Sequence, residues 1–302
     1  GIFLILYGIF ISPPKDFTKG TAFIIKGGAT LSQVSSDLSS AGIVRSPRLF
    51  KLFLLSTFNQ DDLISGEYLL HSKQNMFTIA RRVIRGNFGF DVKRIIILEG
   101  SASHDIPKLF DSSFVHFVEE DFINLASLKE GYLFPDTYFF YTTVKAENVI
   151  DILTKTFEDK IYPFTEDIKN SKRSLKDIVI MASIVEREAL HDEDRALVSG
   201  VLWKRIDIGM ALQVDAPFAY VSNKSTYELT TEDLRADSPY NTYTRRGLPP
   251  TPISNPGLSS IKASIFPEKS NYLYYLSDKK GTIYYAETFE GHKQNRLKYL
   301  GK

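Results

Sequence analysis

The sequence predicts an α+β protein, with a small N-terminal β/α unit followed by a larger mixed α+β part. In the first third of the chain, short apolar strands alternate with glycine turns and amphipathic helices. Longer helical patterns fill the middle, and the region after Met210 is rich in Pro, Gly, Asn and Tyr, which is typical of loops and short strands. The 302 residues, 43% of them hydrophobic, suffice for two or three packed domains. We therefore place domains at residues 1–12, 20–90 and 91–302.

The composition argues against several classes of function. A net charge of +1 does not favour a broad nucleic-acid-binding surface. The chain has no cysteine, which removes thiolate catalysis and zinc–thiolate sites. Its five histidines are scattered without metal-ligand spacing, and it contains no phosphate-binding glycine motif. We accordingly expect no metal, no cofactor and no nucleic-acid partner.

The first residues, GIFLILYGIFI from Gly1 to Ile11, carry no charged side chain. A membrane-spanning helix needs about 20 apolar residues, so this stretch alone is too short. We interpret residues 1–12 as the C-terminal part of a transmembrane anchor, ended by Pro13-Pro14. A cleaved signal peptide and a buried core helix are the alternatives, although no A-x-A-like cleavage site follows.

Strand–glycine–helix units recur in the first third of the chain. The segment Phe23–Leu38 reads FIIKGGATLSQVSSDL, an apolar strand and a glycine turn before a helix with one apolar face. A shift of 72 positions reproduces the pattern at Ile95–Phe110, and Gly66–Ile84 contains a looser copy. These units resemble the LysM modules that bind N-acetylglucosamine-containing glycans, which would make residues 20–90 a LysM-like glycan-binding domain. A plain α+β scaffold is the alternative.

The predicted helix LKDIVIMASIVEREAL carries the most informative residue of the chain. It begins after an S-x-x-D capping box at Ser174. On a helical wheel, Met181, Ile184 and Val185 lie within about 60° of Glu188, so a carboxyl occupies the apolar face. Burial raises the pKa of a carboxyl, which suits a general acid working near neutral pH. The alternative is that Glu188, close to the helix end, simply reaches water.

A second glutamate on the same helix points elsewhere. Glu186 lies about 160° around the helix axis from Glu188. The two carboxyls therefore cannot flank one glycosidic bond as the pair of an ordinary glycosidase does. Either a second carboxylate comes from another segment, or the reaction needs only one.

Five segments occur in order along the chain: EGYLFPDTY, MASIVERE, RIDIGMALQVD, YNTYTRRGLPPTPISNPG and ASIFPEKSNYLYYL. Their order and spacing resemble those of the endolytic murein transglycosylases, over almost the whole chain after the N-terminal stretch. The resemblance implies that Glu188 is the catalytic acid, the residue that the helical wheel also selects, with Glu186 in a supporting role. It further implies a set of substrate-binding residues: Gln213, Asp215, Asn241, Thr242 and Tyr243.

One loop departs from the pattern of the family that the chain resembles. Where the family commonly reads Thr-Asp-Pro-Thr after Leu-Gln, this chain has Val214, Asp215, Ala216 and Pro217. The missing hydroxyls put the geometry of the loop in doubt.

The resemblance implies a carbon–oxygen lyase reaction on peptidoglycan. The β-1,4 bond between N-acetylmuramic acid and N-acetylglucosamine would be cleaved without water, leaving a 1,6-anhydro-muramyl end and terminating nascent glycan strands. One acid suffices because the substrate's N-acetyl group can stabilise C1 and its C6 hydroxyl can attack. A muramidase that uses water and a non-catalytic peptidoglycan-binding scaffold are the alternatives.

The resemblance and the apolar N-terminal stretch together predict a location. We expect a single-pass protein of the cell inner (cytoplasmic) membrane, with its globular part in the periplasm. Its partners would be peptidoglycan glycan strands, and penicillin-binding protein synthases are candidates as well.

Overall fold

The computed structural model describes residues 11–15, 17, 20–58, 62–222, 228–230, 232–278 and 280–301. The chain divides into two compact units, Gly1–Val92 and Lys93–Lys302. Most of the predicted anchor, residues 1–10, lies outside the described residues. Among the helices of the described ranges, none is both long and apolar enough to cross a membrane.

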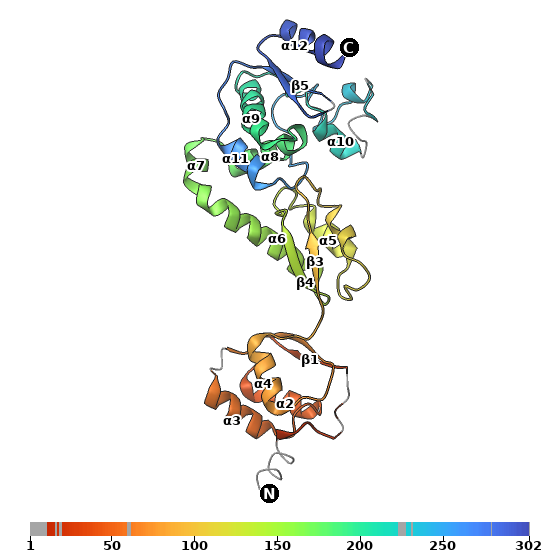
Figure 1. Ribbon diagram of the computed structural model, residues 1–302, viewed down its shortest axis with the longest axis vertical. Helices are drawn as coiled ribbons and strands as arrows, with labels where there is room; N and C mark the ends of the chain where they lie inside the picture. The colour runs from red at the N-terminus through yellow and green to blue at the C-terminus, as the bar shows by residue number, and fades with distance from the viewer. Residues whose placement is uncertain are drawn as a thin grey trace. The chain divides into compact units, whose positions relative to one another are not determined.

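The first unit is built on a pair of antiparallel strands. Strand β1 (Thr21–Ile25) pairs with β2 (Gly66–Leu70), with Phe23 opposite Tyr68. Three helices accompany the strands (Figure 1): α2 (Leu31–Ser40), α3 (Pro47–Thr57) and α4 (Met76–Arg85). Each helix begins after a capping residue whose side-chain oxygen accepts a backbone N–H, namely Thr30, Ser46 and Asn75. The apolar faces of these elements form one core.

The second unit begins with a small sheet and two helices. Strand β3 (Val92–Ile96) pairs with β4 (Thr137–Tyr141). Helices α5 (Glu119–Ala126) and α6 (Ala146–Ile161) pack against each other, and both contribute to the core beneath the strands. Burial alternates along β4, as expected for a strand. Tyr138 and Phe140 face the core, and the other three residues face outward.

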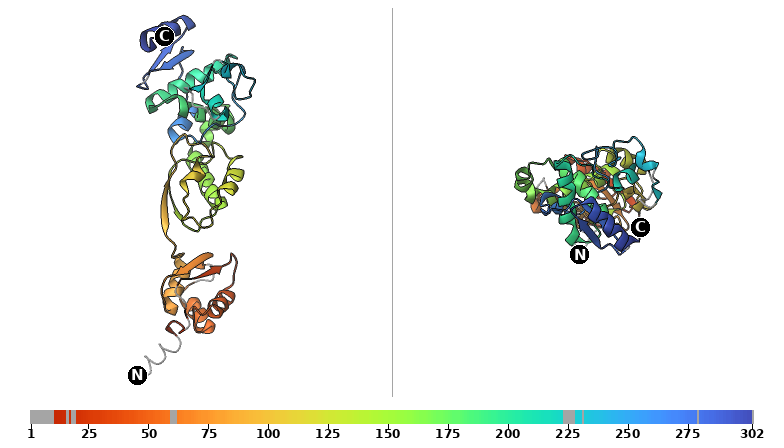
Figure 2. Two further views of the ribbon diagram at one scale, coloured as in Figure 1. Left: turned by 90° about the vertical axis from the view of Figure 1, so that its right-hand side faces the viewer. Right: turned by 90° about the horizontal axis from the view of Figure 1, so that it is seen from above.

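The rest of the second unit is a helical layer with a terminal hairpin. Helices α8 (Leu175–Glu188), α9 (Asp192–Asp207) and α11 (Leu258–Ile265) pack on one another. The antiparallel strands β5 (Tyr274–Ser277) and β6 (Ile283–Ala286) lie beside helix α12 (Phe289–Asn295), as Figure 2 shows. The remaining elements are α7 (Thr165–Asn170), α10 (Ala216–Ser222), the 3-10 turns η3 (Ile106–Leu109), η4 (Tyr162–Phe164) and η6 (Asp233–Arg235), and the π turn η7 (Arg296–Leu300).

The predicted α+β class is confirmed, but one of the three expected repeat copies is wrong. The copy at residues 95–110 provides a strand and then only the short turn Ile106–Leu109 in place of a helix. Pro107 has no N–H to donate and disfavours a helical residue before it, which limits the segment to a single turn. Its strand pairs with β4 of the second unit. The LysM likeness of residues 20–90 stays a prediction.

Candidate active site

Helix α8 places Glu188 at the end of a fully buried segment. The helix starts after Ser174, whose side chain accepts the backbone N–H of Asp177 at 3.0 Å, as the capping box predicts. Every residue from Ile178 to Val185 is buried, so this stretch is surrounded by protein on all sides. The wheel's division into an apolar and a polar face therefore holds only for the last turn. Glu188 ends the helix and keeps part of its surface exposed.

The carboxyl of Glu188 has a hydrogen-bond donor and a raised pKa. The Tyr275 hydroxyl donates to Glu188 Oε2 at 2.9 Å. Burial raises the pKa of Glu188 to about 7, the Tyr275 hydrogen bond opposes the rise, and the nearby charge of Asp215 adds to it. The positive charges of Arg205 and Arg187 also oppose the rise. At neutral pH a large share of this carboxyl therefore carries its proton.

Arg205, near Glu188, joins three segments of the site. Its side chain is buried, and Nε donates to the carbonyl oxygen of Leu273 at 2.6 Å while Nη1 donates to that of Leu212. Burial lowers the pKa of Arg205, and the Glu188 charge opposes that change. Arg205 on α9 thus fixes both the start of the β5 segment, which carries Tyr275, and the loop before Asp215.

Asp215 and Tyr243 form the other side of the charged cluster. The Tyr243 hydroxyl donates to Asp215 Oδ1 at 2.6 Å, across 28 positions of sequence. Burial, the Asp215 hydrogen bond and nearby negative charge all raise the pKa of Tyr243, so it remains a donor at neutral pH. Asp215 acts on Glu188 through its charge. The structure therefore brings three of the predicted site residues, Glu188, Asp215 and Tyr243, into one electrostatic cluster.

Thr242 holds the loop that departs from the family pattern. The Val214 backbone N–H donates to Thr242 Oγ1 at 2.9 Å, and that hydroxyl donates to the Val214 carbonyl at 2.7 Å. The Gln213 N–H donates to the Thr242 carbonyl at 3.1 Å. Val214 and Ala216 are buried in the core around α8 and α9. The loop is thus secured by backbone groups and by Thr242 instead of by hydroxyls of its own.

Gln213 is held in a left-handed conformation beside this loop. Its φ is 53°, which is uncommon for a residue with a Cβ and costs roughly 1–3 kcal/mol. Its side chain is exposed. A strained backbone that presents an exposed amide is the kind of feature that clusters at ligand sites.

Asn241 lies next to the site but does not expose its amide. The residue is fully buried, and its Nδ2 donates to the carbonyl oxygens of Leu234 and Ala236 at 3.0 and 2.8 Å. Its Oδ1 accepts the Tyr243 N–H at 3.0 Å. In this arrangement Asn241 orients Tyr243, and the predicted substrate binding by its amide would require those contacts to change.

Glu186 has different surroundings from Glu188, as the helical wheel predicts. Its carboxylate receives Arg195 Nη2 at 2.8 Å and the Gly257 backbone N–H at 2.9 Å. Both Glu186 and Arg195 are buried, with side chains 5% and 8% exposed. Arg195 also contacts Asp192 at 2.9 Å. This buried ion pair ties the last turn of α8 to α9 and to the loop before α11.

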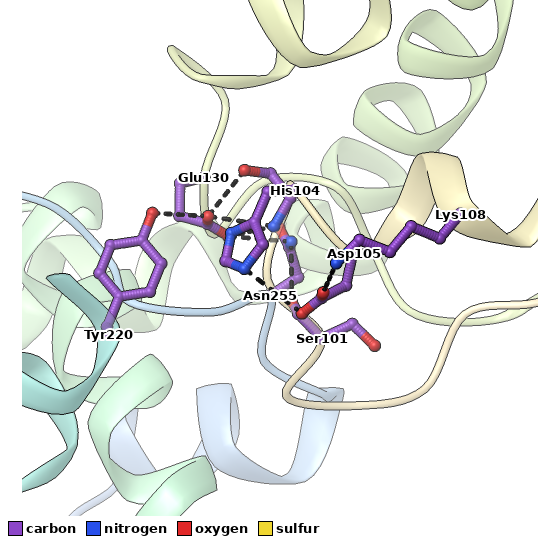
Figure 3. Close-up of polar contacts among 8 residues, drawn as sticks. Ser101, His104, Asp105, Lys108, Glu130, Tyr220 and Asn255 are labelled. Atoms are coloured by element: carbon purple, nitrogen blue, oxygen red, sulfur yellow. Dashed lines mark hydrogen bonds and ion pairs between the residues drawn. The ribbon is translucent and has the colours of Figure 1, made fainter. Parts of the chain in front are cut away.

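A buried carboxylate on another segment supports α10, the helix that follows Asp215. Glu130 is 4% exposed and accepts the Tyr220 hydroxyl at 2.9 Å, the Ser103 hydroxyl at 2.7 Å and an Asn255 amide N–H at 3.1 Å. Figure 3 shows Glu130 with Tyr220 and Asn255. Tyr220 belongs to α10, so Glu130 anchors that helix to residues distant in sequence.

Comparison with known proteins places the chain. It matches the YceG-like family over residues 23–298. This protein belongs to the YceG-like family. The endolytic murein transglycosylase of Bacillus subtilis (strain 168) is 28% identical, over 98% of this chain and 89% of that protein. The endolytic murein transglycosylase of Streptococcus pneumoniae (strain D39) is 28% identical over 91% of this chain, which spans 58% of that protein. A crystal structure of a yceG-like protein of Listeria monocytogenes superposes with a TM-score of 0.59 at 29% identity, covering 92% of this chain and 99% of that one.

These comparisons confirm the family likeness that the five sequence segments indicated. The structure also gives roles to three residues of this YceG-like chain that the sequence did not single out. Glu130, Arg205 and Tyr275 all lie within the quoted segments. No local pattern marks them, because each has a partner that is far away in sequence. In the part of the chain that the structure describes, no cluster of His, Asp and Glu could hold a metal ion.

Proposed function

We propose that this YceG-like protein is a lytic transglycosylase that cleaves the glycan strands of peptidoglycan, with Glu188 as its catalytic acid. The observation that carries the proposal is the Glu188 carboxyl, whose pKa burial raises to about 7 and which ends a helix that is buried from Ile178 to Val185. A general acid is most effective when its pKa lies near the working pH. The names of the relatives from Bacillus subtilis and Streptococcus pneumoniae support the same activity.

The proposed reaction needs one acid that later acts as a base. Protonated Glu188 donates its proton to the glycosidic oxygen as the bond from that oxygen to C1 of the muramyl residue breaks. The substrate's acetamido group stabilises C1. The C6 hydroxyl oxygen then bonds to C1, and its proton passes to the Glu188 carboxylate. The product is a 1,6-anhydro end, no water is consumed, and Glu188 is protonated again.

Neighbouring side chains fit this cycle. The Tyr275 hydroxyl orients the carboxyl and stabilises its ionised form in the second half of the cycle. The positive charge of Arg205 stabilises the Glu188 carboxylate after the proton has been donated. We assign Tyr243 and the exposed Gln213 to substrate contact, with Asp215, Asn241 and Thr242 holding them. Glu186 acts through the position of the last turn of α8.

The decisive experiment digests purified sacculi and measures the new glycan ends by mass spectrometry. Glu188→Gln should remove nearly all anhydro-muramyl ends, a loss of about 10²–10⁴-fold. The matched control is Glu193→Gln, an exposed glutamate on α9, which should retain activity. Reducing ends from the wild-type protein would instead indicate a muramidase. Binding of sacculi without new ends of either kind would indicate a scaffold protein.

We propose that the first unit binds glycan strands in the manner of a LysM module. The supporting feature is a cavity of about 500 Å³ between β1 and α2, lined by backbone and side chains from Ala22 to Ala41. The polar groups Gln33 and Asp37 lie on its wall and suit sugar hydroxyls. The double variant Gln33→Ala/Asp37→Ala should weaken cosedimentation with sacculi. Unchanged cosedimentation would refute glycan binding at this cavity.

We further propose that the protein works at the cell inner membrane, with its globular part in the periplasm, and ends nascent strands beside the penicillin-binding protein synthases. An extracytoplasmic polymer as substrate and the uncharged residues 1–11 support this location. Fractionation of cells should find the full-length protein with the membranes. Crosslinking in living cells tests the association with synthases. Recovery in the soluble cytosolic fraction would contradict the proposed location.

A further inference from the structure

The first unit contains a second cavity whose lining is strongly basic. It has a volume of about 350 Å³, and helix α4 supplies four of its lining residues. Three guanidinium groups, from Arg81, Arg82 and Arg85, line it together with neutral polar side chains such as Gln74 and Thr78. None of the described residues that line this cavity is acidic. Neither the proposed catalysis nor the proposed glycan binding uses this cavity.

Arg82 forms the buried floor of the cavity. The residue is 8% exposed, and its guanidinium donates to the Asn87 carbonyl at 2.9 Å, the Leu69 carbonyl at 2.8 Å and Gln74 Oε1 at 3.2 Å. All three acceptors are neutral, and none of the residues that the structure describes forms an ion pair with this guanidinium. Burial lowers the pKa of Arg82. An arginine has five N–H groups, which leaves two of them available to a ligand.

The backbone at residue 89 makes room for this buried guanidinium. Gly89 has a φ of +78°, and a Cβ there would lie 2.3 Å from Arg82 Nη2 and 2.4 Å from the Leu69 carbonyl oxygen. Only glycine fits without displacing one of them. The site is therefore built around Arg82, and Arg82 is not an incidental surface side chain.

Arg81 and Arg85 bring two more positive charges to the rim. Both are exposed, and neither forms an ion pair or hydrogen bond with a residue that the structure describes. They are four positions apart on α4, where like charges destabilise a helix by roughly 0.2–0.5 kcal/mol. The helix dipole favours Arg85 near the C-terminus, but it does not account for Arg81, one turn earlier. An anion between the two side chains would remove the repulsion.

We propose that this cavity is a binding site for a phosphate group. The planar fork of arginine matches phosphate oxygens in a bidentate manner. Three guanidiniums together offer more donors than the two oxygens of a carboxylate can accept, whereas a phosphate has additional acceptor oxygens. The same chemistry is offered by free inorganic phosphate and by the headgroup of an anionic phospholipid. The site lies outside the catalytic unit, so it can exist whether or not the proposed glycan cleavage is correct.

The test uses the full 302-residue chain and two double variants. Arg81→Gln/Arg85→Gln removes the rim charges and leaves the buried Arg82 intact. The matched control is Arg48→Gln/Lys51→Gln. These two residues are three positions apart on helix α3 of the same unit, and neither lines the cavity. Equal melting temperatures show that all three proteins are folded. Calorimetric titration with inorganic phosphate gives one affinity, and cosedimentation with vesicles of phosphatidylglycerol and phosphatidylcholine in equal parts gives the other.

The proposal expects at least one of these two affinities to fall about tenfold or more in Arg81→Gln/Arg85→Gln and to change less than about twofold in the control. Loss of vesicle binding, together with displacement by phosphate, identifies the lipid headgroup as the source. Loss of phosphate binding alone identifies the free anion. The wild-type protein and both variants carry the same apolar N-terminal stretch, so any vesicle binding by that stretch does not affect the difference between them. Wild-type affinities in the cavity variant, equal losses in both variants, or no binding by the wild-type protein would overturn the proposal.

Discussion

Removal of the Tyr275 hydroxyl should move the pH dependence of catalysis in a defined direction. That hydroxyl donates to Glu188 Oε2 at 2.9 Å and holds the pKa of the carboxyl below the value that burial alone would give. Tyr275→Phe removes the donor and makes the surroundings of Glu188 more apolar. Both changes disfavour the ionised carboxylate, so both raise its pKa above about 7.

The size of the shift follows from the energy of the hydrogen bond. A hydrogen bond to a charged group contributes about 1.5–3 kcal/mol, and one pKa unit corresponds to about 1.4 kcal/mol. Because Glu188 keeps some contact with water, we expect the lower end, a shift of about one unit. Protonated Glu188 starts the reaction, so activity declines as pH rises through its pKa. In Tyr275→Phe this decline should therefore occur about one pH unit higher.

The assay is the rate of release of anhydro-muramyl ends from sacculi, measured across the neutral and alkaline range. Tyr284→Phe is the matched control, because the Tyr284 hydroxyl donates to the Asp278 carboxylate in the same hairpin at 3.1 Å. Its pH profile should coincide with that of the wild-type protein. An alkaline limb that stays in place or moves to lower pH in Tyr275→Phe would refute the role assigned to this hydrogen bond.

Three further predictions concern stability and turnover. Folding raises the pKa of Glu188 from 4.5 to about 7, so the folded state loses up to about 3 kcal/mol of stability as pH rises through that window. Glu188→Gln should therefore increase the melting temperature, relative to wild type, more at pH 8 than at pH 4. An equal change at both pH values would contradict this. Glu186→Gln should destabilise the fold by roughly 3 kcal/mol or less, because Arg195 loses one of its acidic partners. Measurable turnover should remain. Complete loss of turnover in a stably folded Glu186→Gln protein would contradict the supporting role of Glu186. Gln213→Gly should stabilise the fold by roughly 1 kcal/mol in chemical unfolding, because glycine adopts the left-handed backbone without strain. If the exposed amide contacts substrate, the same change should raise KM. An unchanged KM would exclude that contact.

Local signals in the sequence were sufficient for much of the framework. The helix expected after Ser174 begins there, and residues 146–161, whose apolar side chains recur at helical spacing, also form a helix. Both follow from periodicity and end signals, which operate over a few residues and are visible in a single chain. The divergence of Glu186 and Glu188 is likewise a consequence of helix geometry. The short helix Thr165–Asn170 is different, because its polar sequence has little periodicity and packing decides its conformation.

Tertiary structure alone decided the surroundings of the catalytic carboxyl. Glu188 and Tyr275 are separated by 87 positions, and Asp215 and Tyr243 by 28, so no local rule relates either pair. The same holds for Asn241. The sequence predicted that its amide binds substrate, whereas in the fold the amide donates to two backbone carbonyls. Sequence could name a carboxyl with the potential to act as an acid. Its pKa depends on burial and on charges that approach only when distant segments pack together, because desolvation and Coulomb energies depend on distance in space.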